Sequence, residues 1–257
     1  MIRAGSAKRL GHTVQRFAAL DSTQVEAARC AAAGAAEGTV VTTAHQSAGR
    51  GRRGRVWLDA PGESLLMSVI LRPPMAAALA PQLSLVSAIA VVDALHDVAG
   101  IHGEIRWPND VLLDGRKVSG ILAEAASDAS GRLAHVILGI GVNVNQVCFP
   151  GELGQGATSL RLATERPHEV AAVLSALLDA LQERYARFVE GGLSALRPIW
   201  LERAWSIGRR VHTGDGREGL AVDLAGDGAL VIRTDDGAML RVVAGEVVTE
   251  ADHAPAH

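Results

Sequence analysis

Apolar residues recur along the chain up to residue 205 with two different periods. Leu79 to Val98 and Glu169 to Val189 carry them three and four positions apart, which is the spacing of one helix face. The short runs Gly38 to Thr43 and Ser64 to Leu71 are instead rich in β-branched and other apolar residues, as in buried strands. Because the two kinds of segment alternate, we expect an α+β fold with a mixed sheet and packed helices.

Turn and capping residues mark further elements. Asp21-Ser22-Thr23 offers N-cap residues before a helix expected from Gln24 to Ala36. Asp114-Gly115 predicts a type I′ hairpin between two strands. Further strands are expected at Val56 to Leu58, Glu104 to Trp107, Val111 to Leu113, Lys117 to Ala125 and Leu133 to Val144, a loop at Gly151 to Thr164, and a helix at Leu193 to Trp205.

The pattern changes near Ser206. From Gly208 onward no helical period is left, and two glycine-rich turns, at 226–228 and 235–237, separate short apolar runs. This pattern predicts a small β-barrel or sandwich with strands at Arg209 to Thr213, Arg217 to Leu224, Ala229 to Arg233 and Met239 to Val243. We therefore expect two domains, residues 1–205 and 206–257.

Composition narrows the class of protein. The chain has 257 residues, 48% of them hydrophobic, so it can bury a large core. Its formal net charge of −3 gives no overall attraction to DNA or to an acidic membrane. Cys30 and Cys148 lack the spacing of a zinc or disulfide framework. No N-terminal apolar core of a signal peptide and no uninterrupted apolar run of about 18 residues is present, so a cytoplasmic location without a membrane span is expected.

The segment Gly49-Arg50-Gly51-Arg52-Arg53-Gly54-Arg55 is a local exception to this charge balance. Three glycines disfavour helix and strand, and four arginines repel one another unless an anion binds among them. A solvated loop, an Arg/Gly nucleic-acid segment or a localisation patch would show the same composition. The segment lies between two apolar runs inside the chain, which favours a loop that binds a small anion.

A second cluster surrounds Trp107-Pro108-Asn109-Asp110. Pro108 favours an extended Trp107, and the following hairpin returns the chain so that Lys117 can lie near Asn109 and Asp110. The alternative is a turn-capping Asn109 and a surface ion pair worth less than about 1 kcal/mol. Of 25 Lys and Arg residues only Lys8 and Lys117 are lysines, which favours a specific role for Lys117.

Four ordered motifs of this sequence closely resemble those of biotin protein ligases. They are the segment 49–55, Trp107-Pro108-Asn109-Asp110, Lys117-Val118-Ser119-Gly120-Ile121-Leu122 and Gly139-Ile140-Gly141-Val142-Asn143. The resemblance implies a class II synthetase-like α+β domain followed by an SH3-like barrel. It also implies ATP-dependent activation of biotin as biotinyl-5′-AMP, followed by transfer of biotin to a lysine of a biotin carboxyl carrier domain.

The resemblance implies a set of biotin contacts. Ser22 and Thr23, which also look like helix caps, match residues that bond the ureido ring, and either role is open. Gln46 matches another position of the biotin pocket. The other implied biotin contacts are Arg50, Gly51, Arg52, Lys117, Gly120, Leu122, Gly139 and Gly141.

The resemblance also implies an adenylate subsite and a catalytic set. Trp57 matches the aromatic residue that stacks on adenine, and Asn109 matches an adenine or phosphate contact. Lys117, Arg52 and Asp110 form the implied catalytic set, in which Asp110 either accepts the proton of the attacking amine or holds Mg²⁺. The implied ATP or adenylate contacts are Arg52, Arg55, Trp57, Asn109, Lys117 and Asn143.

The chain departs from the family pattern in two places. Arg106 stands where the family often has lysine, so we leave it out of the catalytic set. About twenty residues precede Asp21, too few for the winged-helix domain of the repressor type, so we expect the monofunctional type without DNA binding, as a monomer or weak homodimer. Two other classes stay open: a lipoate or octanoate ligase or transferase on the related fold, and a nucleic-acid module that uses the basic loop.

Overall fold

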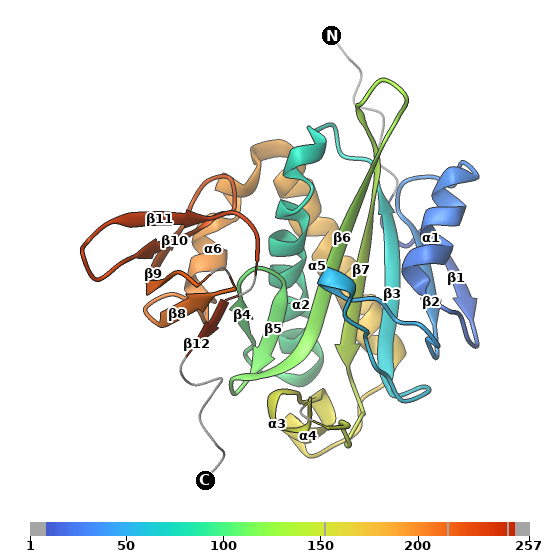
Figure 1. The fold of residues 1–257 in the computed structure, drawn as a ribbon. Coiled ribbons are helices and arrows are strands. Elements are labelled where there is room, and N and C mark those ends of the chain that lie inside the picture. The colour runs from blue at the N-terminus through green and yellow to red at the C-terminus, as the bar shows by residue number, and fades with distance from the viewer. Residues whose placement is uncertain (1–8, 152, 215, 246, 250–257) are drawn as a thin grey trace.

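A seven-stranded mixed sheet forms the centre of the computed structural model, which describes residues 9–151, 153–214, 216–245 and 247–249 (Figure 1). The strands lie in the order β1-β2-β3-β7-β6-β5-β4. β1 is parallel to β2, and the other neighbours are antiparallel. The strands are β1 Thr13–Phe17, β2 Thr39–Thr43, β3 Ser64–Leu71, β4 Glu104–Arg106, β5 Asp110–Leu113, β6 Arg116–Ser127 and β7 Leu133–Asn143.

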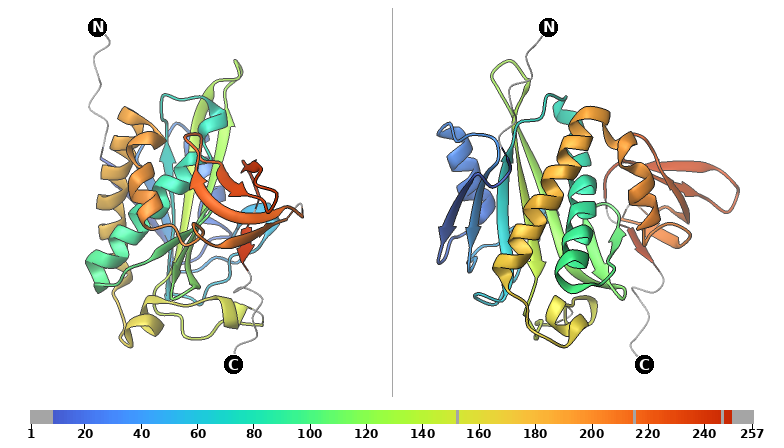
Figure 2. Two further views of the ribbon diagram at one scale, coloured as in Figure 1. Left: turned by 90° about the vertical axis from the view of Figure 1, so that its left-hand side faces the viewer. Right: turned by 180° about the vertical axis from the view of Figure 1, so that it is seen from behind.

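Helices cover both faces of this sheet. α2 (Gln82–Ala99) and α5 (Val170–Gly191) pack together over one face and enclose the main core (Figure 2). α1 (Thr23–Ala32) lies on the opposite face over a smaller cluster that includes Val41 and Ile137. Each large aliphatic side chain buried in these cores stabilises the fold by about 1.5–3 kcal/mol. The short helices are α3 Leu153–Gly156, α4 Leu160–Thr164 and α6 Arg197–Glu202, with 3₁₀ turns η1 Arg52–Gly54, η2 Ala77–Leu79 and η3 Leu193–Ala195.

The α2 region is the one described segment with the length and hydropathy of a membrane span. Of its most apolar window, 78% is buried inside the protein. Packing against α5 and the sheet accounts for this composition, because a helix that is apolar all round belongs in a core as readily as in a bilayer.

The alternation of side chains along β7 determines which residues point to the α1 face of the sheet. Ile137 packs under α1, so Gly139 and Gly141, two and four positions later in β7, point to the same face. Their register partners are Leu122 and Gly120 of β6, and Ser68 of β3 is paired with Gly139. Small and polar residues thus line one stretch of this face, beside the first turn of α1.

A second antiparallel sheet follows at the β4 end of the first. Its order is β11-β10-β9-β8-β12, and the strands are β8 Arg210–Thr213, β9 Glu218–Leu224, β10 Leu230–Arg233, β11 Met239–Val242 and β12 Val247–Thr249. Its buried residues, such as Leu224 and Ile232, join the main core of the first sheet. The expected all-β module is confirmed as a separate antiparallel sheet. No ladder joins β11 to β12 among the described residues, so closure of this sheet into the predicted SH3-like barrel stays a prediction.

Most predicted elements are confirmed, and the differences have local causes. The predicted strand Val56 to Leu58 was wrong: the segment makes one bridge, Arg50 to Val56, in the basic loop. The predicted 151–164 loop contains α3 and α4, the second starting at the N-cap Ser159. The helix expected at Leu193 to Trp205 is a 3₁₀ turn followed by α6. The helix expected to reach Ala36 ends at Ala32. Two strands were not predicted at all, β1 and β12, nor were their pairings. Lys8 lies outside the described residues.

Candidate active site

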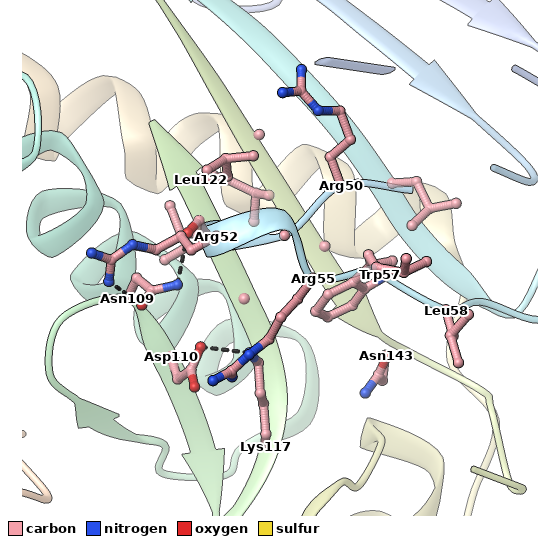
Figure 3. A pocket seen from close by; sticks show the side chains of 18 of the residues that line it. Arg50, Arg52, Arg55, Trp57, Leu58, Asn109, Asp110, Lys117, Leu122 and Asn143 are labelled. Carbon is pink, nitrogen blue, oxygen red and sulfur yellow. Dashed lines mark hydrogen bonds and ion pairs between the residues drawn. The ribbon is translucent and has the colours of Figure 1, made fainter. Parts of the chain in front are cut away.

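A cavity of about 320 Å³ opens on the α1 face of the seven-stranded sheet. Its floor is formed by the small residues of β6 and β7, its closed end by the start of α1, and its cover by the loop that carries η1 (Figure 3). Segments far apart in the sequence therefore meet in one hollow. A floor of glycines, with charged and amide groups around it, suits a flat polar ligand.

A buried network of hydroxyl and amide groups closes the α1 end of the cavity. The Thr23 backbone N–H and side-chain hydroxyl both donate to Gln46 Oε1, at 2.8 and 3.1 Å. Ser68 Oγ lies 2.9 Å from Thr23 Oγ1 and 3.0 Å from Gln24 Oε1. Ser22 caps α1 by accepting from the Gln24 N–H at 3.2 Å, which confirms its predicted capping role.

The direction of these hydrogen bonds follows from Gln24. Its Nε2 donates to the carbonyl of Ile137 at 3.0 Å and approaches that of Leu122 at 3.5 Å. Gln24 Oε1 is therefore an acceptor, and the Ser68 hydroxyl is its donor. Gln46 Oε1 already accepts two bonds from Thr23, so the Gln46 amide NH₂ is the group with donors to offer a ligand.

Three floor glycines leave space that any side chain would fill. A Cβ at Gly139 would lie 2.5 Å from Gln24 Oε1, and one at Gly141 would lie 2.6 Å from the Trp57 ring. A Cβ at Gly120 would lie 2.9 Å from the same ring. The glycines are needed because other side chains already touch the backbone at these positions.

Two cations and a carboxylate form the opposite end of the cavity. Lys117 Nζ lies 2.6 Å from Asp110 Oδ1 (Figure 3). Arg106 donates to Asp110 Oδ2 at 3.0 Å. The register of β5 and β6 shifts between Val111 and Leu112, so that Val118 is an extra residue in β6. This bulge turns Lys117 toward the cavity while Val118 stays in the core.

The same geometry sets the charge state of Asp110. Burial alone raises the pKa of this carboxyl, but the charges of Lys117 and Arg106 and their hydrogen bonds outweigh burial and hold the pKa below its usual value. Asp110 is therefore ionised at neutral pH. Each of its two oxygens is paired with a cation, and the side chain is largely buried, so the contact with Lys117 is not the surface ion pair considered as the alternative.

The basic loop is anchored at Arg52. Its guanidinium donates to Asn109 Oδ1 at 2.9 Å and to the Gly245 carbonyl of the second sheet at 3.4 Å. Asn109 is itself fixed, because its Nδ2 donates to the Ile121 carbonyl at 2.9 Å. The loop folds back on itself through the Gly51 N–H, which donates to the Arg55 carbonyl at 2.8 Å.

Trp57 lies between the loop and the floor of the cavity. Lys117 Nζ is 5.8 Å from the centroid of its ring, and the ring lies against Gly120 and Gly141. Arg55 and Asn143 line the same hollow, and Asn143 Nδ2 donates to the Thr158 carbonyl at 2.9 Å. The structure thus brings the predicted adenylate contacts to one end of the cavity.

Arg50 is placed differently from the other cations. Its guanidinium pairs with Glu124 at 3.0 Å, both side chains are more than a third exposed, and Figure 3 shows it directed away from Asp110 and Lys117. Arg50 nevertheless belongs to the lining of the cavity. The predicted Arg50–ligand contact would require the guanidinium to leave Glu124, and it stays a prediction.

Comparison with known proteins identifies the family to which the chain belongs. Residues 17–143 match the Biotin/lipoate A/B protein ligase family, and residues 206–249 match the Biotin protein ligase C terminal domain. The chain is 36% identical over 229 residues to the biotin--[acetyl-CoA-carboxylase] ligase of Paracoccus denitrificans, covering 86% of this chain and 94% of that protein. The chain belongs to the biotin protein ligase family.

Other relatives give the same assignment. The bifunctional ligase/repressor BirA of Bacillus subtilis strain 168 is 40% identical over 223 residues, which are 85% of this chain and 68% of that protein. The solved biotin protein ligase from Aquifex aeolicus in complex with biotin and ATP superposes with a TM-score of 0.81 at 30% identity, covering 92% of this chain and 98% of that chain.

Two residues of this biotin protein ligase site were missed in the sequence. Gln24 was interpreted only as the start of a helix, and Ser68 only as part of a buried strand. Each had a signal: Ser68 is a polar residue inside an otherwise apolar run, and Gln24 follows the capping residues on the first turn of α1. The implied positions Ser22, Thr23, Gln46, Gly51, Arg52, Lys117, Gly120, Leu122, Gly139 and Gly141 all line the cavity.

Proposed function

We infer that this chain is a biotin protein ligase that forms biotinyl-5′-AMP from biotin and ATP, releases pyrophosphate, and transfers biotin to a lysine of a carrier domain with release of AMP. The observation that carries this inference is the polarity of the cavity. Its hydroxyl and amide end, at Thr23 and Gln46, fits a neutral ureido group. Its cationic end, at Lys117 and Arg52, fits a carboxylate beside a phosphate.

The first step joins two anions, the biotin carboxylate and the α-phosphate of ATP. Fixed positive charges reduce their repulsion and stabilise the negative charge that develops in the transition state. We propose that Lys117 and Arg52 supply these charges, and that Trp57 stacks on the adenine. Asn109 then acts mainly by holding Arg52, since its amide bonds to both Arg52 and Ile121.

The second step requires a neutral lysine amine to attack the mixed anhydride. A carboxylate with a lowered pKa is a weak proton acceptor, so we propose that Asp110 orients the incoming amine through a hydrogen bond. The proton that the amine loses can pass to solvent at the open mouth of the cavity. This proposal replaces the role of Asp110 as a general base.

Magnesium has a limited set of donors in this cavity. Among the described lining residues Asp110 is the single carboxylate, and no group of three His, Cys, Asp or Glu side chains is placed to hold a metal ion in the described part of the chain. These residues do not form a metal site made by the protein alone. We propose that Mg²⁺ arrives bound to the ATP phosphates, as is usual for this ion.

The proposal extends to the acceptor and to the chain organisation. A carrier domain of an acyl-CoA carboxylase is the proposed acceptor, in line with the name of the Paracoccus denitrificans relative. We propose that residues 1–205 form the ligase domain and residues 206–257 a module that braces it, in a cytoplasmic monomer or weak homodimer that does not bind DNA.

The direct test is incubation with biotin, ATP, Mg²⁺ and a biotin carboxyl carrier domain. We expect one carrier lysine to gain the mass of a biotinyl group, which is biotin less one water, and AMP to accumulate. A tenfold excess of lipoate over biotin should leave the rate unchanged, because the Thr23–Gln46 pair recognises a polar ring. Absence of transfer by folded protein would exclude the ligase, and labelling by lipoate instead would assign the chain to the related activity.

Replacing Ser68 by alanine should weaken biotin binding specifically. The change removes the donor to Gln24 Oε1 and leaves a buried acceptor unpaired, so we expect the KM for biotin to rise about 5- to 20-fold, with the KM for ATP within about twofold of the original. Ser87→Ala is the control, because this buried serine donates to Leu83 inside α2. Equal changes in both KM values would contradict a role confined to the biotin end.

A further inference from the structure

Arg106 is the second cation on Asp110. It is the last residue of β4, and the β4–β5 register places it directly opposite Asp110. Its guanidinium reaches Asp110 Oδ2 at 3.0 Å, while Lys117 reaches Oδ1 at 2.6 Å. All three side chains are largely buried, with 20%, 14% and 29% of the Arg106, Asp110 and Lys117 side chains exposed. The trio carries one net positive charge.

That surplus charge matters for Lys117. If Lys117 were the sole partner of Asp110, moving its ammonium onto a ligand would leave a buried carboxylate uncompensated, which proteins strongly avoid. With Arg106 in place, Asp110 keeps a charge-assisted hydrogen bond when Lys117 moves. The Lys117 ammonium can therefore leave Asp110 and bind an anionic group of the substrates during the reaction.

Arg106 is held at its far side by Trp205. The guanidinium carbon lies 5.9 Å from the centroid of the Trp205 ring, a cation–π distance. Trp205 is 5% exposed and is tied to β4 itself, because its backbone N–H donates to the Ile105 carbonyl at 2.9 Å. Trp205 lies shortly before β8, the first strand of the second sheet. The next residue, Ser206, accepts from the Trp107 backbone N–H through its hydroxyl at 3.2 Å.

We propose that Arg106 is a positioning residue of the ligase reaction. Held against Trp205, it keeps Asp110 paired so that Lys117 is free to bind the reacting carboxylate and phosphate. The inference rests on the proposed ligase function. It assigns a role to a residue that differs from the lysine common at this position in the family. A lysine would supply the charge, but it lacks the planar group that lies against Trp205 while bonding Asp110.

Single-turnover formation of biotinyl-5′-AMP tests this role. For Arg106→Met we expect the rate at saturating substrates to fall about 30- to 100-fold, somewhat less than for loss of a direct electrostatic contact, with the Kd for biotin within about threefold. Arg106→Lys should recover the rate to within about tenfold of the original, because it restores a positive charge beside Asp110. If Arg106 had a purely structural role, Arg106→Met would lower the melting temperature. It would then also weaken biotin binding together with the rate, instead of lowering the rate alone.

Arg209→Met is the matched control. The Arg209 guanidinium carbon lies 4.7 Å from the same Trp205 ring, but the residue is exposed and its side chain bonds the Trp205 carbonyl instead of Asp110. We expect its rate to stay within about twofold of the original, as for other surface changes away from a site. An equal loss in Arg209→Met and Arg106→Met would overturn the proposal and assign the effect to Trp205 packing.

The outcomes separate this inference from the function on which it rests. If the original protein forms no biotinyl-5′-AMP, the ligase proposal fails. If it does and Arg106→Met keeps its rate within about threefold, only the positioning role fails. Should Arg106→Met not fold, Arg106→Lys combined with Trp205→Phe decides the point. A combined rate loss smaller than the product of the two single losses supports coupling through the Trp205 ring, because either change already breaks that contact, and a combined loss equal to the product refutes it.

Discussion

Replacing Lys117 by alanine is expected to slow biotinyl-5′-AMP formation by about 10²- to 10³-fold, the usual cost of removing one preorganised electrostatic group. Lys117 is the one lysine within the described residues, and its ammonium is held over the cavity between Asp110 and Trp57. Without it, the carboxylate and phosphate approach each other with less compensating charge. The measurement is the single-turnover rate of adenylate formation from labelled ATP at saturating biotin.

The neighbouring cation provides the control for this prediction. Arg116 is the preceding residue of β6, and it is exposed. Arg116→Ala removes the same charge from the same hairpin without changing the cavity, so its rate should stay within about twofold of the original. Near-original adenylation in Lys117→Ala would show that the placed ammonium is not needed for the step. A matching loss in Arg116→Ala would show that general electrostatics, and not its placement, drives the step.

Replacing Gly139 by alanine is expected to raise the KM for biotin by about 10- to 100-fold. The added Cβ would lie 2.5 Å from Gln24 Oε1. Gln24 cannot swing aside at low cost, because it is 4% exposed and its amide bonds Ile137 and Ser68. Either the Gln24 network breaks or the floor of the cavity moves, and overpacking of this kind costs about 1–3 kcal/mol. Steady-state kinetics with biotin varied at saturating ATP measure the effect.

A glycine in open space tests whether the effect is local. Gly226, in the turn before β10, has nothing within 4 Å of a built Cβ. Gly226→Ala should leave both KM values and the melting temperature unchanged within error. In Gly139→Ala the maximal rate should fall less than the biotin affinity, since Lys117 and Arg52 lie at the other end of the cavity. An unchanged biotin KM in that variant would show that Gln24 moves freely and that the network is not rigid.

Much of the fold follows from local patterns in the chain. The apolar period of α2 and α5, the β-branched runs of β2 and β3, and the change near Ser206 each reflect one element burying one face, which neighbouring residues determine by themselves. The Asp114-Gly115 hairpin was also predictable, because a type I′ turn needs positive φ at both positions, and both have it, at 49° and 74°.

The same patterns miss elements whose formation depends on distant partners. β1 is an edge strand with no fully buried residue and no apolar run, and it forms because β2 offers a parallel neighbour. β12 has three residues and pairs with β8, more than thirty positions earlier. Short strands of this kind gain little from their own sequence, so the partner decides whether they exist.

The candidate site shows the same division. The sequence alone determined which chemistry is available: a glycine-rich cationic loop, an Asn-Asp pair after a proline, a rare lysine and two alternate glycines in β7. Only the tertiary structure decided how these groups act together. The extra residue Val118 turns Lys117 into the cavity, the β4–β5 register sets Arg106 on the second oxygen of Asp110, and packing of α1 on the sheet joins Gln24 to Ser68. Strand register and helix packing are set by contacts between residues far apart in the chain, and so no local pattern encodes them.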